Sequence, residues 1–495
     1  MANGTSVLTG FNVIIRPSPI YVALGGTGSG GDSTPMGLAA FTTALTNCAH
    51  GQKFFLQGDD FKTTATLSIA RPGVEIYGSG STDQAAYATR IMGSVTTTGF
   101  TGAGPYTVAL ATEPKAVWMD DATAYAATAN GRAQLVTRNT GTPTTPGAGE
   151  WGWSAGTLYL GSNPSGRTVE VVPSTSTHSI FTLAPGADDI FISGLEVGYV
   201  AGHGIYAPAL QGAGQLSACN LGLYTVSAYG CYNQLLAAGA LANSGIVIHL
   251  PMKVEGRALS LEYCDNDGLN LKQAGFGNID GLFIRNCGDD GIGTHYGSSL
   301  KVRNFLIDTC AIVASSDGNG VTVFGGGEVS LEQGSILNPG NNGVFLTGVS
   351  TNYVPAIGHM TDVTLSNTAP GVGVGLNGVE GIGRFMLSAN RVHSNFWQNT
   401  TSGKGFGFRF DDGSLAAGNG FATLKDCYSV RCRAGISTAK GGGGTMKVQV
   451  SNIILDDHSV ANTSESGVTK SGTTTVVTLS IGGTQEPTPQ SFYIS

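Results

Sequence analysis

Apolar side chains occupy every second position through the middle of the chain. Leu259 and Leu261 flank a serine, and Leu269 and Leu271 flank an asparagine. A period of two residues places successive side chains on opposite faces of an extended strand, whereas a helix repeats every 3.6 residues. The pattern therefore predicts short β-strands with one buried face.

The same pattern returns at a fixed interval of 23 residues between Ser244 and Phe324. Three sets of positions coincide when the sequence is shifted by this interval: Cys264, Cys287 and Cys310; Leu259, Leu282 and Phe305; Leu261, Ile284 and Ile307. A fixed period of this length indicates stacked supersecondary units, and it is too short for a βαβ unit with its crossover helix. Each repeat is therefore expected to form one coil of a parallel β-solenoid, with the three cysteines stacked as buried thiols.

The repeats divide the chain into five predicted parts. These are an extended N-terminal segment (1–19), a capping helix with the first coils (20–98), a β-rich insertion where the period fails (99–173), the main parallel β-helix (174–460), and a C-terminal hairpin with an extension (461–495). The predicted fold class is thus all-β.

The capping helix is predicted from a proline signal and an apolar face. After a loop at 25–33, Pro35 falls in the first turn, and Leu38, Phe41 and Leu45 recur at helical spacing. Such a helix would cover apolar core and unpaired strand edges at the end of the solenoid. At the other end, a hairpin is predicted around Lys470-Ser-Gly.

Composition removes several classes of function. The chain has 76 glycines, 12% charged residues and a net charge of −8, so its surface does not suit nucleic acid, which requires basic groups. No apolar run is long enough to span a membrane, and no signal peptide is recognised at Met1. The cysteines show no Cys-x-x-Cys spacing, so we assign no metal ligands among them.

The repeat predicts columns of side chains that point outward. If Leu269 and Leu271 face the core, Asn270 and Lys272 face out, and the 23-residue register stacks His249, Lys272 and His295 about 4.8 Å apart. Phe324 continues this column. Stacked cations repel unless an anion neutralises them, which favours a substrate carboxylate or a nearby aspartate; the alternative is a row of solvated side chains.

A second outward column contains Glu262, Arg285 and Asp308. Opposite charges on adjacent strands form a charge ladder worth roughly 0.2–1 kcal/mol per pair. We interpret this column as structural.

The turns between coils carry aspartates, and three interpretations stay open. Asp-Gly is a favoured turn pair on backbone grounds alone. Alternatively, two carboxyl groups could act as acid and base on a glycosidic bond at ~5 Å or ~6.5–9.5 Å. Third, a Ca²⁺ cluster could assist proton abstraction beside a uronate carboxylate, with Lys272 as base. Apart from that interpretation, we expect no required cofactor and no metal site. The turn aspartates are Asp265, Asp267, Asp289, Asp290 and Asp317.

The candidate site combines these turns with the outward column. The candidate catalytic residues are Asp267, Asp289, Asp290, His295 and Lys272, and the candidate substrate-binding residues are His249, Asn270, Tyr296, Asp317 and Phe324.

Several segments resemble a known superfamily. Tyr21-Val followed by a glycine-rich loop, Gly51-Gln-Lys-Phe-Phe-Leu and Gly73-Val-Glu-Ile-Tyr-Gly-Ser-Gly are similar to the start of right-handed parallel β-helix proteins of the pectate-lyase-like superfamily. The segment from Glu150 to Leu160 is similar to one often found before the main coils. The resemblance implies a right-handed parallel β-helix; the superfamily includes lyases, hydrolases, epimerases and non-catalytic binders.

A shorter motif resembles polygalacturonase-type hydrolases. Gly288-Asp-Asp-Gly-Ile is similar to their paired-aspartate motif, which implies roles for Asp289 and Asp290 and, less closely, for Asp267. The sequence departs from that pattern: Gly202-His-Gly lies on an earlier coil instead of a later one, His295 lies in the same repeat, and no Arg-x-Lys motif follows.

The chain as a whole resembles phage tailspike or tail-fibre proteins. This implies a homotrimer in a virion tail, made in the host cytoplasm, which binds and cleaves a bacterial surface polysaccharide and contacts other tail proteins. If it is an enzyme, it would be a polysaccharide depolymerase, either a glycoside hydrolase or a polysaccharide lyase. The alternatives are a non-catalytic virion adhesin or structural tail protein, and a bacterial lyase or epimerase.

Overall fold

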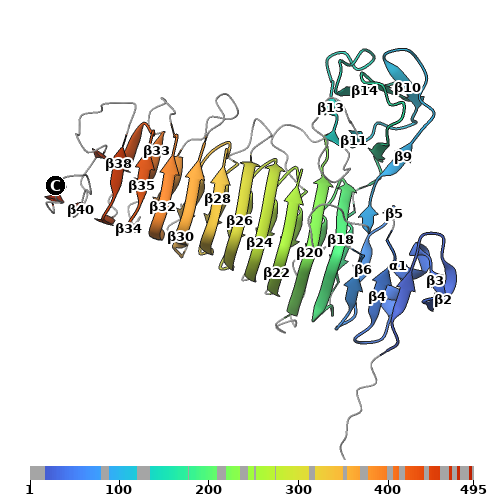
Figure 1. Ribbon diagram of the computed structural model, residues 1–495, viewed down its shortest axis with the longest axis horizontal. Helices are drawn as coiled ribbons and strands as arrows, with labels where there is room; N and C mark the ends of the chain where they lie inside the picture. The colour runs from blue at the N-terminus through green and yellow to red at the C-terminus, as the bar shows by residue number, and fades with distance from the viewer. Residues whose placement is uncertain are drawn as a thin grey trace, which may run out of the picture.

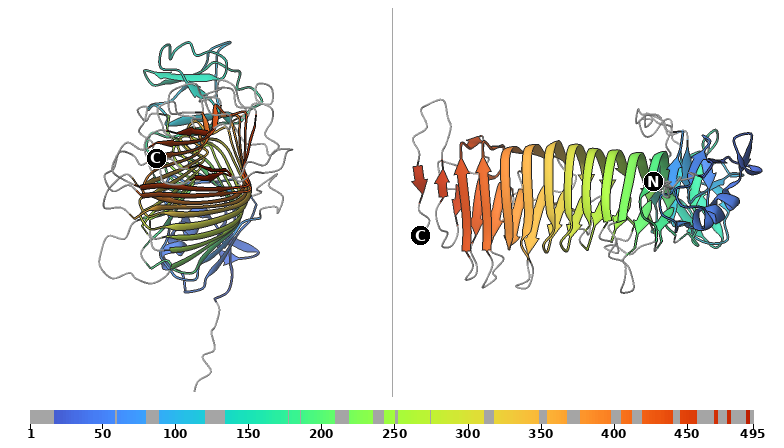
Figure 2. Two further views of the ribbon diagram at one scale, coloured as in Figure 1. Left: turned by 90° about the vertical axis from the view of Figure 1, so that its left-hand side faces the viewer. Right: turned by 90° about the horizontal axis from the view of Figure 1, so that it is seen from below.

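The structure is a computed structural model of the chain, shown in Figures 1 and 2. It describes residues 17–58, 60–79, 89–119, 134–176, 178–184, 186–208, 219–234, 243–249, 252–273, 275–310, 318–348, 354–367, 377–397, 405–411, 419–439, 445–456, 468–470, 477–479 and 490–492. The predicted N-terminal extended segment therefore lies almost wholly outside the described residues, as does Asp317.

Two long sheets wind along a common axis as a parallel β-helix (Figure 2). The first sheet has 19 strands. They are β1 (Ile20–Val22), β2 (Thr27–Gly31), β3 (Thr34–Met36), β4 (Lys53–Leu56), β5 (Asp60–Lys62), β7 (Glu75–Tyr77), β8 (Arg90–Met92), β18 (Ile190–Val200), β20 (Cys219–Cys231), β22 (Met252–Glu262), β24 (Phe276–Cys287), β26 (Ser299–Cys310), β28 (Glu328–Leu337), β30 (Ala356–Ser366), β32 (Phe385–Asn395), β34 (Asn419–Lys425), β35 (Tyr428–Val430), β37 (Thr445–Ser451) and β38 (Ile454–Asp456).

The second sheet has 12 shorter strands, one for each coil. They are β6 (Leu67–Ile69), β17 (Phe181–Leu183), β19 (Ile205–Ala207), β21 (Ile246–Ile248), β23 (Leu269–Leu271), β25 (Ile292–His295), β27 (Val321–Phe324), β29 (Val344–Gly348), β31 (Asn377–Gly383), β33 (Phe406–Asp411), β36 (Ala434–Ala439) and β39 (Val468–Lys470). From β18 to β33 each of them follows a long strand of the first sheet, so the chain alternates between the two sheets as it advances.

The register confirms the 23-residue repeat. Leu259 lies beside Leu282, which lies beside Phe305. Cys287 lies beside Cys310, and the thiol of Cys264 interacts with those of Cys231 and Cys287. The predicted stack of buried thiols is therefore present, and it has one more member, Cys231, than the sequence indicated. These cysteines are free thiols within the apolar core.

A left-handed residue recurs at the matching position within or just after the long strands, and these residues form a column across ten coils. Their φ angles lie between 50° and 81°. Left-handed backbone costs a non-glycine residue roughly 1–2 kcal/mol, so the sharp bend is stabilised by the ladders on both sides. The column is Gly194, Thr225, Ala258, Gly281, Asn304, Gln333, Asp362, Arg391, Asp426 and Asn452.

The N-terminal end differs from the prediction in detail. The helix α1 (Leu38–Asn47) buries Phe41 and Leu45 as expected, but it begins after Pro35. Residues 34–36 instead form β3, which pairs with β1 and with β2. Met36 fills the core beside Val22, and this pairing overrides the proline signal for a helix start. Strand β2 also lies where a loop was expected.

The C-terminal hairpin prediction is wrong in its pairing. Val468–Lys470 (β39) joins the second sheet in parallel with β36. The strand β40 (Val477–Leu479) instead pairs antiparallel with β41 (Gln490–Phe492). The repeat therefore extends further than the loss of apolar alternation indicated.

The insertion forms two small sheets on the side of the solenoid (Figure 1). One contains β10 (Tyr106–Ala109), β13 (Thr137–Arg138), β14 (Glu150–Ser154) and β15 (Thr157–Leu160); the other contains β9 (Val95–Thr97), β11 (Ala116–Met119), β12 (Gln134–Leu135) and β16 (Val169–Val172). The buried Trp118 joins the insertion to the solenoid, because its ring packs against Tyr199, Tyr229 and Tyr263. Gly230 leaves room for this ring; a Cβ there would lie 2.9 Å from Trp118 Cζ2.

The described part of the chain contains no helix with the length and apolar character needed to cross a membrane.

Candidate functional site

A ladder of buried polar side chains runs along the turns that lead into the second sheet. Each member precedes the glycine that opens the coil, and we call this column the turn ladder. Its members are His203, Ser244, Asp267, Asp290, Asn319, Asn342 and Asn377. A buried backbone N–H needs an acceptor, and in five of the turns a ladder side chain of the preceding coil supplies it.

Five of these hydrogen bonds repeat the same geometry. The backbone N–H of Ser244 donates to His203 Nδ1 at 3.0 Å, and that of Asp290 donates to Asp267 Oδ1 at 3.3 Å. The bonds continue from the N–H of Asn319 to Asp290 Oδ1 (2.8 Å), from that of Asn342 to Asn319 Oδ1 (3.0 Å), and from that of Phe406 to Asn377 Oδ1 (3.1 Å).

The middle of the turn ladder is acidic. Asp267 and Asp290 occupy positions that neutral amides occupy in later coils, and the half-buried Asp289 adjoins them. One carboxylate oxygen from each of these three residues lies within 4.8 Å of the others. We call Asp267, Asp289 and Asp290 the acidic cluster.

Burial and mutual repulsion hold protons on this cluster. Burial and the charge of Asp289 raise the pKa of Asp267 to about 7, against the opposing charge of Lys272. Burial also raises the pKa of Asp290, and the charges of Asp267 and Asp289 raise it further. The cluster therefore contains carboxyl groups that stay protonated well above their ordinary range.

The predicted outward column is present beside the cluster. His249, Lys272 and His295 directly follow the aligned residues Ile248, Leu271 and Thr294, and His295 pairs with Phe324. Burial, together with the charge of Lys272, lowers the pKa of His295 to about 4. The pKa of His249 is lowered by the same two causes. The imidazoles are therefore neutral near pH 7, and Lys272 supplies the positive charge that acts on Asp267.

A missing side chain lets the column and the cluster share one space. Gly293 aligns with Asn270 on one side and Thr322 on the other. A Cβ at Gly293 would lie 2.8 Å from His295 Nε2 and 3.0 Å from Asp267 Oδ2. The imidazole of His295 and the carboxylate of Asp267 therefore border the same small volume, which any larger residue would fill.

The predicted binding residues divide into two groups. Asn270 is buried and donates its amide to Asp267 Oδ2, so it orients the cluster. Tyr296 is 49% exposed, and its ring lies 5.7 Å from Phe324 in an edge-on arrangement. Phe324 also lies 6.1 Å from the ring of His295. Tyr296 and Phe324 thus form an aromatic wall next to the imidazole.

The cluster could also hold a hard cation. Three carboxylates offer the oxygen ligands that Ca²⁺ prefers. Lys272 acts against such an ion, because its positive charge already stabilises the ionised form of Asp267. Within the described residues, this is the one group of at least three acidic, histidine or cysteine side chains close enough to share an ion.

The second predicted column (Glu262, Arg285 and Asp308) and the turn residue Asp265 make contacts that stabilise the fold. Arg285 Nη2 lies 2.8 Å from Glu262 Oε2, and Asp308 accepts a hydrogen bond from Asn338 Nδ2 at 3.1 Å. Asp265 accepts the backbone N–H groups of Asn233 and Asn243 at 2.9 and 2.6 Å. These contacts fix strands and turns outside the acidic cluster.

The sequence analysis missed His203 as a member of the site. Its pKa is lowered to about 4 by burial and by the charges of His249 and Lys272, and its ring lies 4.8 Å from that of Tyr206. The signal was available, because His203 precedes Gly204 as Asp267 precedes Gly268. The 41-residue step from His203 to Ser244 hides this register.

No protein-family model matches the chain, and no curated protein matches it. Solved structures do. A protein described as XylC in complex with xylose has a TM-score of 0.51 at 10% identity, covering 90% of this chain and 76% of its own. A family 28 exopolygalacturonase from Yersinia enterocolitica has a TM-score of 0.40 at 11% identity, covering 92% and 78%. The tailspike of Pseudomonas phage phi297 has a TM-score of 0.30 at 14% identity, covering 90% and 73%.

The first of these similarities supports the fold. Together with the parallel register of both sheets, it confirms the prediction of an all-β, right-handed parallel β-helix. At 10% identity it shows the fold alone. Function therefore has to be argued from the site.

Proposed function

We propose that this chain binds a polysaccharide along the second sheet and cleaves it as a glycoside hydrolase at the acidic cluster. One observation carries the proposal: Asp267 and Asp290 stand where neutral amides stand in later coils, although the side chains of Asn319 and Asn377 accept the same backbone hydrogen bond. Burying charge where an amide suffices raises the free energy of the fold, so we assign the carboxyl groups a chemical role.

The pKa values suit acid and base roles at neutral pH. A carboxyl group with a pKa of about 7, such as Asp267, is partly protonated and can donate to a leaving sugar oxygen. Asp289 is the most accessible member and would activate water or attack the anomeric carbon. The compact cluster fits the shorter carboxyl separation of ~5 Å better than the longer one. Because the groups interact, they titrate as a unit.

The neighbouring column would bind the sugar. Lys272 would pair with a carboxylate on an acidic sugar, and neutral His295 would accept a proton or a hydroxyl hydrogen bond. Tyr296 and Phe324 offer ring surface for the apolar face of a pyranose.

A reducing-sugar assay on a panel of bacterial capsules tests the proposal. Asp267→Asn and Asp289→Asn should each reduce product release by about 10²–10⁴-fold, the range of general acid–base catalysis. Asp362→Asn is the matched control, because Asp362 lies on a long strand with an exposed ion pair to Arg391. Full activity in both cluster variants would contradict the assignment.

A second candidate is a lyase or epimerase with a bound cation. The three carboxylates within 4.8 Å and the adjacent Lys272 favour it, since a cation would acidify the proton beside a uronate carboxylate. An unsaturated product with ultraviolet absorbance that disappears with chelator and returns with Ca²⁺ would support it. Product release that is insensitive to chelator supports the hydrolase.

We further propose that the chain acts as a tailspike of a bacteriophage, as a homotrimer in the virion tail. The resemblance in sequence and the long regular solenoid with a side insertion support this assignment. Light scattering should give three copies per particle, and purified protein should bind encapsulated cells and lose binding when the capsule is removed. Cell binding with no product at any protein concentration would indicate a non-catalytic adhesin.

A further inference from the structure

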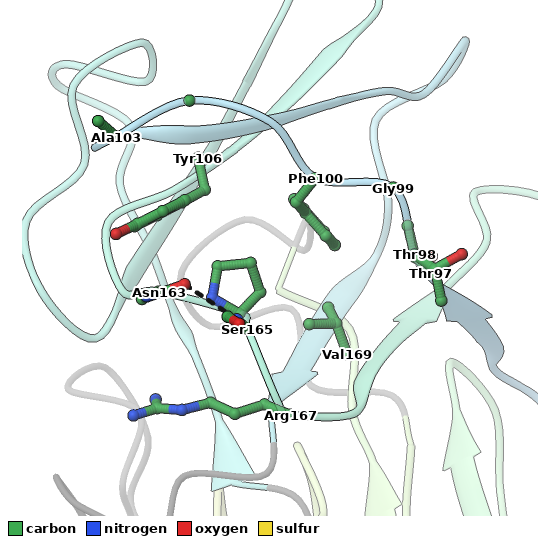
Figure 3. A pocket seen from close by; sticks show the side chains of 12 residues that line it. Thr97, Thr98, Gly99, Phe100, Ala103, Tyr106, Asn163, Ser165, Arg167 and Val169 are labelled. Atoms are coloured by element: carbon green, nitrogen blue, oxygen red, sulfur yellow. Dashed lines mark hydrogen bonds between the residues drawn. The ribbon is translucent and has the colours of Figure 1, made fainter.

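A cavity of about 600 Å³ opens in the insertion (Figure 3), and its lining residues are distinct from the acidic cluster. It lies between the segment that follows β9 and the loop that precedes β16. Its lining includes Phe100, Ala103, Tyr106, Asn163, Ser165 and Arg167. A volume of this size is within the range of small-ligand sites.

Aromatic rings form one wall of this cavity. Phe100 and Tyr106 are half-buried, pack against the core of the insertion, and direct their side chains toward the loop 163–167 (Figure 3). A pyranose ring has an apolar face of C–H groups, which packs on an aromatic ring, and an edge of hydroxyls, which needs hydrogen-bond partners. Tyr106 offers both, because its ring carries a hydroxyl.

Polar groups form the opposite wall. Arg167 is the charged residue among those that line the cavity, and Asn163 and Ser165 add an amide and a hydroxyl. The loop is fixed by hydrogen bonds from Ser165 N to Asn163 Oδ1 (2.9 Å) and from Arg167 N to Pro164 O (3.1 Å). A planar guanidinium matches a carboxylate with two parallel hydrogen bonds, so this wall fits an anionic group.

The walls are set on a rigid base. Trp153 Nε1 donates to Leu110 O at 2.9 Å, and Trp151 Nε1 donates to Gln234 Oε1 of the solenoid at 2.9 Å. The backbones of Thr101 and Thr107 exchange hydrogen bonds of 2.9 and 2.8 Å, which close the segment that carries Phe100. A site held in this way loses little conformational freedom when a ligand binds.

We propose that this cavity is an accessory binding site for an acidic sugar unit, with the sugar ring on Phe100 and Tyr106 and its carboxylate on Arg167. The choice of a saccharide as ligand rests on the proposed function; the site itself is separate from the acidic cluster and takes no part in bond cleavage. Its expected role is to retain the polysaccharide between cleavage events.

The insertion is joined to the solenoid close to the chemistry. Tyr263 Oη donates to Gln134 Oε1 at 3.3 Å, and Trp118 packs on the ring of Tyr263. Tyr263 lies only four residues before Asp267. A polysaccharide held by the insertion would therefore have one stretch near the coils that carry the cluster, which raises its effective concentration there.

Binding is tested with the full chain carrying Asp290→Asn, so that no probe is cleaved. The probes are trisaccharides of galacturonate and of mannuronate, with maltotriose as the neutral match, measured by saturation-transfer NMR and calorimetry. We expect a uronate to bind more tightly than maltotriose. Arg167→Gln should weaken uronate binding at least 10-fold and remove the preference for uronate over maltotriose. Tyr106→Ala should abolish uronate binding.

Matched variants separate the site from folding. Tyr159→Ala removes a tyrosine from the neighbouring strand β15 without touching the cavity lining and should leave affinity unchanged. Ala103→Trp fills the cavity from an exposed position and should block binding without removing a polar group. Affinity that is the same in Arg167→Gln, Ala103→Trp and Asp290→Asn alone, or no binding of either uronate, would overturn the proposal.

The same variants keep this proposal apart from the proposed hydrolase. Arg167→Gln in the otherwise unaltered chain should still release product from a capsule that the wild type cleaves, but should require more substrate. Uronate binding without product release from any capsule would retain the accessory site and reject the hydrolase. Product release with no uronate binding would reject the accessory site and retain the hydrolase.

Discussion

The turn ladder has an acidic part and an amide part, and the two solve the same problem with different side chains. In the amide part, Asn319 and Asn377 accept a buried N–H from the next coil. In the acidic part, Asp267 and Asp290 accept the equivalent N–H with a carboxylate oxygen. Backbone satisfaction is therefore equal in both.

The difference is electrostatic. Burial raises the pKa of Asp267 to about 7 and raises that of Asp290, because an ionised carboxylate loses its hydration in the turn. A neutral asparagine makes the same bond without that cost. The comparison shows how a repeat can identify candidate functional residues. They are the residues that carry an ionisable group at a position where a neutral side chain makes the same structural hydrogen bond in other coils.

Asp290→Asn should have the largest effect, and on activity alone. The amide preserves the acceptor for Asn319 N and removes a buried carboxyl group whose ionised form Asp267 and Asp289 repel. We expect capsule cleavage to fall by about 10³-fold, in the range of general acid–base catalysis. The melting temperature should stay equal or rise, as measured by calorimetry. A parallel loss of stability and activity would make Asp290 a structural residue.

Asn342→Asp tests the opposite exchange. Asn342 is 1% exposed and interacts with Glu380, a buried carboxylate that already pairs with Arg409. A second carboxylate there should destabilise the fold by about 3 kcal/mol at pH 7, as an uncompensated buried charge does. The loss should shrink at pH 4, where the new group is protonated. Thermal unfolding at the two pH values measures it.

Asn163→Asp is the control for that exchange. Asn163 is exposed, and a carboxylate can still accept the N–H of Ser165. Its effect should stay within about 0.5 kcal/mol. An equal loss in both variants would show that the position in the turn ladder is not what decides the cost.

Asn377→Ala should cost less than a buried charge. It leaves the buried N–H of Phe406 without its side-chain acceptor, which costs roughly 1–3 kcal/mol. Asn377→Asp adds charge while keeping the acceptor, so comparing the two separates the hydrogen bond from the electrostatics. If the alanine variant melts at the wild-type temperature, the turn ladder contributes nothing to stability.

The smallest expected effect is the pH dependence of wild-type stability. Because the pKa of Asp267 is raised in the folded protein, its contribution to the free energy of unfolding falls as pH rises from 3.8 toward about 7. The pKa values of His203 and His295 are lowered from 6.5 to about 4. The contribution of these histidines to the free energy of unfolding therefore falls as pH drops from 6.5 toward about 4. These slopes oppose each other.

Substituting either Asp267 or a histidine should reveal the pH dependence of stability that the other group contributes. In Asp267→Asn the histidine contribution remains, so the melting temperature should fall more steeply than in the wild type between pH 6.5 and pH 4. In His295→Gln the slope should change toward greater stability in acid. Identical profiles for all three proteins would show that these groups do not carry the shifts.

The fixed repeat explains why part of the site could be predicted. Once alternation places Leu269 and Leu271 in the core, the 23-residue register assigns neighbours. The structure places His249, Lys272 and His295 directly after aligned residues and pairs His295 with Phe324. The same register brings Asp267 next to Asp290, and Asp289 directly precedes Asp290 in the chain. The three carboxyl groups of the acidic cluster therefore lie close together.

Features that depend on sterics or on distant segments could not be predicted. Ala258 and Gln333 adopt left-handed backbone because the neighbouring coils bend there, although neither residue type favours it. Trp118 packs on Tyr199 and Tyr229, which belong to coils that follow the insertion. Thr34–Met36 forms a strand because β1 and β2 lie beside it.

The column of left-handed corners also explains how coils of unequal length coexist. Because every long strand turns at the same place, extra residues gather in the connections and leave the spacing of the rungs untouched. The step from His203 to Ser244 is longer than the step from Asp267 to Asp290, yet both pairs bond alike. New peptide could thus be grafted between rungs without disturbing the rows of side chains they display.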